Sequence, residues 1–158
     1  MSSETVFLIH LILGYVAWML CFAVYILPRL RSMDRIGAHR AIATLHSFRF
    51  FGLVFILPGV VGSNLPAGFA RFAAYGDLAT GLLAMVALVT VGIRPLFWLF
   101  VVAFNLVGSA DIIIDYYHAI PIIYVPLLMI THLVAFYWLM RPQSKATRAL
   151  AGDVSSQV

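Results

Sequence analysis

The sequence predicts an all-α integral membrane protein, a bundle of five transmembrane helices with its N-terminus outside and its C-terminus in the cytoplasm. Of its 158 residues, 63% are hydrophobic and 10% are charged. The mean hydropathy is +1.02, far above the range of soluble proteins. Apolar runs of about 20 residues recur along the chain, which is the length that crosses a hydrocarbon core of about 30 Å.

The five expected spans form one bundle over residues 1–141. They cover residues 5–27, 43–61, 72–92, 96–114 and 120–140. The first follows Met-Ser-Ser-Glu with no basic segment, which indicates a spanning helix and not a signal peptide. The second carries His46 and Arg49 near its start and Pro58-Gly59 near its end, so a re-entrant segment is the alternative.

The distribution of basic residues favours five spans. Five crossings leave Glu4, Arg71 and two aspartates on one side. They gather the other basic residues on the opposite side: Arg29, Arg31, Arg35, Arg40, Arg94, Arg141, Lys145 and Arg148. The positive-inside rule then gives an outer N-terminus in the inner membrane, whereas a re-entrant second segment would largely remove this bias.

Residues outside the spans are expected to form loops and a tail. The basic segment 28–42 is interpreted as a cytoplasmic loop that orients the protein, with contact to anionic lipid as an alternative. The polar segment 142–158 is expected to be a disordered cytoplasmic tail. Small residues such as Gly76, Gly81 and Gly108 allow close helix packing within the bundle or in a homo-oligomer.

A polar cluster at the end of the fourth expected span is the first site candidate. Asp111, Asp115 and His118 stand at positions i, i+4 and i+7, which places them on one face of a helix. Asn105 lies about a third of a turn away. A solvated helix end is the alternative interpretation of this cluster.

Counting residues along each expected span places further polar groups at depth. His10 and Asp77 fall in the outer third, and Asn105 and His132 fall near the midplane, below a bend expected at Pro126. An ionisable group at depth costs at least about 2.5 kcal/mol, so such groups usually face the bundle interior. These residues predict an outward-facing pocket that binds or passes a proton, an ion or a small polar ligand. The alternative is interhelical hydrogen bonding in a structural or assembly subunit.

The inner membrane face supplies a second candidate. His46 and Arg49 lie toward the cytoplasmic end of their span, where Arg49 is expected to extend to phosphate and form a lipid-headgroup site. The expected partners are therefore the lipid bilayer and a membrane partner protein or second copy of the chain.

Other classes of function receive little support. The single Cys21 excludes an internal disulfide and a cysteine-based metal cluster. The arginines form no basic stripe for nucleic acid, and no serine elbow or phosphate loop suggests an enzyme. His10, His46 and His132 fall at different depths, which does not favour haem. No two histidines have the i, i+4 spacing that a zinc site would prefer. The sequence identifies no cofactor or metal.

Several runs resemble a group of small uncharacterised bacterial multi-span proteins. They include His46-Ser-Phe-Arg49-Phe-Phe-Gly52, Ala74-Tyr75-Gly76-Asp77, Asn105-Leu-Val-Gly-Ser-Ala-Asp111 and Thr131-His132. The resemblance covers most of the chain between His46 and His132. It implies a bacterial inner-membrane setting, and it carries no established activity or catalytic residue.

Overall fold

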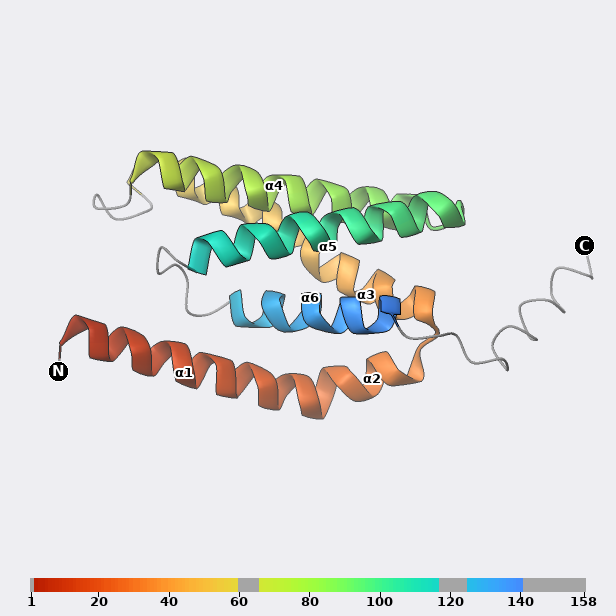
Figure 1. Ribbon diagram of the computed structural model, residues 1–158, viewed down its shortest axis with the longest axis horizontal. Helices are drawn as coiled ribbons and strands as arrows, with labels where there is room; N and C mark the ends of the chain where they lie inside the picture. The colour runs from red at the N-terminus through yellow and green to blue at the C-terminus, as the bar shows by residue number, and fades with distance from the viewer. Residues whose placement is uncertain (1, 60–65, 117–124, 141–158) are drawn as a thin grey trace, which may run out of the picture.

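All regular secondary structure in the described part of the protein is helical (Figure 1). The computed structural model describes residues 2–59, 66–116 and 125–140, and no strand occurs among them. Three helices are long and apolar enough to cross a membrane: Glu4–Ser32, Ala67–Val89 and Arg94–Ile114. This is the architecture of a helical membrane protein.

The first helical stretch runs as one continuous rod to Ser32. It contains α1 (Ser3–Cys21), the π-helical turn η1 (Phe22–Ile26) and α2 (Leu27–Ser32). The side chain of Ser2 caps α1 by accepting a hydrogen bond from the Thr5 N–H. Pro28 has no N–H to donate to the preceding turn, which accounts for the π-helical turn just before it. The rod packs mainly on α6 and leaves most of its surface outward.

The second helical stretch begins earlier than the sequence predicted. Helix α3 (Arg35–Ser47) starts inside the segment interpreted as a basic loop, so that interpretation was wrong for residues 35–42. The physical reason is a cap: Asp34 Oδ1 accepts a hydrogen bond of 3.0 Å from the Gly37 N–H. At Phe48 the chain tightens into the 3₁₀ helix η2 (Phe48–Ile56). There, side chains three residues apart lie on one face.

The last three helices are α4 (Ala67–Val89), α5 (Arg94–Tyr116) and α6 (Val125–Met140). A tight turn joins α4 to α5, with the Ile93 N–H bonded to the Thr90 carbonyl at 2.9 Å. Pro126 is the second described residue of α6, so the bend expected there involves a preceding turn that lies outside the described residues. Figure 1 shows α4 and α5 side by side, with α6 between α5 and the α1 rod.

Small and aromatic side chains together form the apolar core. Phe97, Val101 and Phe104 of α5 are fully buried. They pack in one cluster with alanines from each neighbouring helix: Ala38, Ala43, Ala84, Ala87 and Ala135. Alanine lets helix backbones approach closely in a membrane bundle. This close packing brings η2, α4, α5 and α6 around one polar centre.

Candidate functional site

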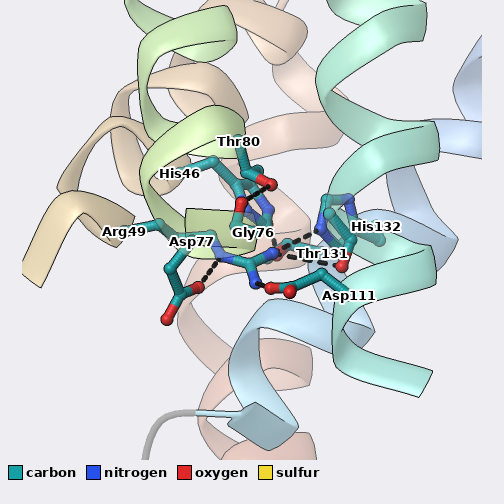
Figure 2. Close-up of polar contacts among 9 residues, drawn as sticks. His46, Arg49, Gly76, Asp77, Thr80, Asp111, Thr131 and His132 are labelled. Carbon is teal, nitrogen blue, oxygen red and sulfur yellow. Dashed lines mark hydrogen bonds and ion pairs between the residues drawn. The ribbon is translucent and has the colours of Figure 1, made fainter. Parts of the chain in front are cut away.

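A buried arginine forms the centre of the candidate site (Figure 2). Arg49 projects from η2, and its side chain is only 1% exposed. Its Nε donates to Asp77 Oδ1 on α4 at 2.5 Å, and its Nη2 donates to Asp111 Oδ2 on α5 at 2.5 Å. Its Nη1 donates to the Gly108 carbonyl at 3.2 Å. One guanidinium therefore ties three helical elements together.

A hydrogen-bonded chain extends from the guanidinium to α6. Asn105 Nδ2 donates to the Val101 carbonyl at 2.7 Å, which leaves its Oδ1 to accept from His132 Nδ1 at 2.8 Å. The other ring nitrogen, His132 Nε2, lies 3.4 Å from Arg49 Nη1. Because guanidinium can only donate, His132 Nε2 must be the acceptor. The arrangement holds His132 neutral, with its proton on Nδ1.

A second imidazole lies beside the first. The His46 and His132 rings have centroids 4.1 Å apart. His46 Nε2 lies 2.9 Å from Thr131 Oγ1, and that hydroxyl donates to the backbone carbonyls of Leu127 and Leu128. His46 therefore donates to Thr131, which fixes its proton on Nε2.

Three glycines make room for the charged groups. A Cβ atom at Gly52 would collide with the Asp77 carboxylate, and one at Gly76 would collide with the Asp111 carboxylate. A Cβ atom at Gly108 would lie 2.6 Å from His132 Nε2 and 2.7 Å from Arg49 Nη1. The small residues thus admit buried side chains of this chain. At Gly108 the space that a Cβ would fill is occupied by His132 and Arg49 of the same chain.

Among the described residues, the formal charges of Arg49, Asp77 and Asp111 do not balance. Arg49 carries one positive charge, whereas Asp77 and Asp111 carry two negative charges when both are ionised. Removing ions from water costs several kcal/mol per ion, and attraction offsets this cost only when the charges are matched and hydrogen-bonded. A buried centre with an excess negative charge favours the uptake of one positive charge.

A cavity reaches the centre on the Asp77 side. It has a volume of about 180 Å³ and lies between η2, α4, α5 and α6. Arg49 and Asp77 are its charged lining residues, and its other walls are apolar, including Phe48, Phe51 and Leu128. The Asp77 side chain is 15% exposed and the Asp111 side chain only 2%. Asp77 is therefore the accessible carboxylate of the pair.

The structure brings together four of the residues predicted for the polar pocket. Asp77, Asn105, Asp111 and His132 all belong to the centre around Arg49. His10 does not: its side chain is exposed and bonds to the Val6 carbonyl of its own helix at 2.8 Å. Figure 1 places α1, which carries His10, on the opposite side of the bundle from α4. The side chain of Asp115 and the whole of His118 lie outside the described residues.

The lipid-headgroup site predicted at His46 and Arg49 is corrected by the structure. His46 is 0% exposed and Arg49 2% exposed, so neither reaches a membrane surface. The physical reason is the pair of carboxylates on α4 and α5, which accept hydrogen bonds from the guanidinium inside the bundle. Arg49, Gly52 and Phe55 are spaced at every third residue, which places the arginine beside a gap only in a 3₁₀ helix, and no local sequence pattern predicted that conformation.

Among the described residues, no group of three or more histidines, cysteines or acidic residues has a geometry suited to a metal ion. The centre is thus built from ion pairs and directed hydrogen bonds.

The family comparison matches a model described as a domain of unknown function (DUF8737) over residues 6–140. The chain belongs to this family. Every residue of the Arg49 centre falls inside the matched region. A search of curated proteins found no match for the chain, and a search of solved structures found none either. The description of the family names no activity.

Proposed function

We propose that this member of the DUF8737 family is a multi-pass protein of a bacterial inner membrane, and that its Arg49 centre binds or passes a proton or a small polar ligand. The observation that carries the proposal is the excess carboxylate: two aspartates flank one buried guanidinium, and one of them, Asp77, lines a cavity. A site of this kind exchanges one positive charge without separating its helices.

Five crossings with an outer N-terminus form part of the proposal. The helical stretches in Figure 1 lie side by side and run in alternating directions. Arg29, Arg31, Arg35 and Arg94 all lie where a stretch ends or begins at one end of the bundle. A cytoplasmic position for that end agrees with the positive-inside rule. The cavity beside Asp77 lies nearer the opposite end, since η2 runs away from the arginines.

A structural role is the second candidate, and a specific observation favours it. The centre joins η2, α4, α5 and α6 through a single network of hydrogen bonds, as interhelical glue would. Under this alternative Asp77 and Asp111 have equivalent roles, because each fastens Arg49 to a neighbouring helix. Under the binding proposal only Asp77 takes up the proton or ligand, and Asp111 stays bonded to Arg49.

Thermal unfolding of the detergent-purified protein across pH separates the two candidates. Asp77→Asn and Asp111→Asn are compared with wild type, and Glu4→Gln serves as a control because it removes a carboxylate that is exposed. We expect wild type and Glu4→Gln to share a pH-dependent step in melting temperature that Asp77→Asn lacks. Lower melting temperatures for both aspartate variants at every pH, with the step retained, would support the structural role and refute the binding proposal.

A further inference from the structure

We infer that the ligand of the cavity beside Asp77 is a monovalent organic cation that carries apolar groups, such as a substituted ammonium ion. This inference rests on the proposed function, because it names the class of ligand for the same site. It is based on the charge of the cavity, the side chains that line it and the access from outside. The aromatic side chains of η2 form much of this lining.

The sign of the ligand follows from which charged group is accessible at the cavity. The Nε and Nη2 atoms of Arg49 already donate to Asp77 and Asp111. An anionic ligand would have to displace a carboxylate from the guanidinium. A cation would instead approach the Asp77 carboxylate, which bonds to Arg49 through Oδ1 and is 15% exposed at the cavity. The cavity therefore favours a cation over an anion.

The described lining of the cavity suits an organic cation better than a divalent metal ion. A divalent cation such as calcium needs six to eight oxygen ligands, and magnesium needs six. Among the described residues, Asp77 supplies the only carboxylate of the cavity lining, and most other lining residues are apolar. Three of them are phenylalanines from η2: Phe48, Phe51 and Phe55. Aromatic faces attract ammonium groups, and apolar walls accept their substituents.

The 3₁₀ geometry of η2 places the ion-paired residues on one face and the exposed phenylalanines on another. Arg49 and Gly52 are three residues apart and both buried, so this face holds the ion pair with Asp77. Phe48 and Phe51 are also three residues apart, and they are 48% and 65% exposed. The rim of the cavity therefore lies on the outer surface of the bundle. A ligand that partitions into lipid reaches it from the side.

The volume agrees with a single compact group. The cavity measures about 180 Å³. Apolar cavities of about 150 Å³ take up benzene, so one ring or one branched ammonium group fits this space. Longer substituents would extend past Phe51 toward lipid.

Equilibrium dialysis of detergent-solubilised protein against benzyltrimethylammonium tests the inference, with protein-free micelles as the reference for partitioning. Wild type and Glu4→Gln should bind the probe saturably and equally. Asp77→Asn should weaken binding at least about tenfold, because the probe loses its only anionic partner. Phe51→Leu should weaken binding about two- to tenfold, since it removes one aromatic face and keeps every charge.

The uncharged isostere neopentylbenzene and the anion benzenesulfonate complete the design. The isostere should bind wild type and Phe51→Leu alike, and benzenesulfonate should not compete. Equal binding of the cation to wild type, Asp77→Asn and Phe51→Leu overturns the inference, and so does saturable binding of the sulfonate that displaces the cation. If the cation fails to bind but the pH-dependent step of Asp77 is present, the ligand class is wrong and the proposed function stands. If both are absent, both proposals fall.

Discussion

The substitution Gly108→Ala adds one methyl group at the most crowded point of the centre. Its Cβ would lie 2.6 Å from His132 Nε2 and 2.7 Å from Arg49 Nη1, whereas ordinary contact begins at 3.4 Å. The His132 and Arg49 side chains would have to move away by about 0.8 Å and 0.7 Å, although both are buried. Overpacking of this kind costs about 1–3 kcal/mol. Helix propensity acts in the opposite direction, since alanine stabilises a helix relative to glycine by up to about 1 kcal/mol.

The matched control is Gly68→Ala in α4, where an added Cβ would have no neighbour within 4 Å. Propensity alone therefore predicts that Gly68→Ala is neutral or stabilising. We expect the free energy of unfolding of Gly108→Ala to be about 1–3 kcal/mol lower than that of Gly68→Ala, because both variants gain helix propensity and only Gly108→Ala overpacks the centre. Equilibrium unfolding in mixed detergent and SDS micelles measures both variants. A Gly108→Ala protein as stable as Gly68→Ala would refute the close packing around the guanidinium.

Two further perturbations test the charges. Arg49→Met should lower the free energy of unfolding by about 3–5 kcal/mol, because it leaves two buried carboxylates without their cation. The triple variant that also carries Asp77→Asn and Asp111→Asn should recover most of this loss, and equal stability of the single and triple variants would contradict the ion-pair assignment. Burial lowers the pKa of His39 below 6.5, so the folded protein binds fewer protons there than the unfolded chain. The stability that the neutral His39 contributes is therefore complete above about pH 6.5 and is lost as the pH falls. His39→Gln should flatten the curve of unfolding free energy against pH between about pH 7 and 5. An unchanged slope would exclude His39 as a source of this pH dependence.

The sequence identified most of the polar centre before its geometry was known. Asp77, Asn105 and His132 are predicted because ionisable or amide groups in apolar helices need partners inside the bundle. Asp111 is predicted from its i, i+4, i+7 pattern with Asp115 and His118. Three of them bond directly to Arg49 or lie within hydrogen-bonding distance of it. Burial of polar groups is thus a property that composition and depth predict well, even though the depth count places each residue only approximately.

The position of Arg49 could not be predicted in the same way. A long arginine side chain near a helix end either extends to the membrane surface or turns inward, and the choice depends on which groups other helices present. Here α4 and α5 present carboxylates, and Gly52 and Gly108 leave space for them and for the guanidinium. These contacts join residues far apart in the chain, so no local pattern contains them.

The predicted start of the second helical stretch differs from the observed one for another reason. Residues 35–42 are too polar for a spanning window, yet the Asp34 cap and the buried Ala38 and Ile42 make them the first turns of α3. The 3₁₀ conformation of η2 was also missed, because a change in helical pitch depends on packing against α4. That change directs Arg49 into the bundle.

Infrared difference spectroscopy of the purified protein between neutral and acidic pH tests the central claim most directly. The carbonyl stretch of a protonated carboxyl group reports the uptake of a proton by an aspartate in the centre. We predict a band that grows on acidification, that disappears in Asp77→Asn and that persists in Asp111→Asn and Glu4→Gln. The absence of the band while the protein remains folded, or its loss in Asp111→Asn alone, would contradict the assignment of Asp77 as the exchangeable carboxylate.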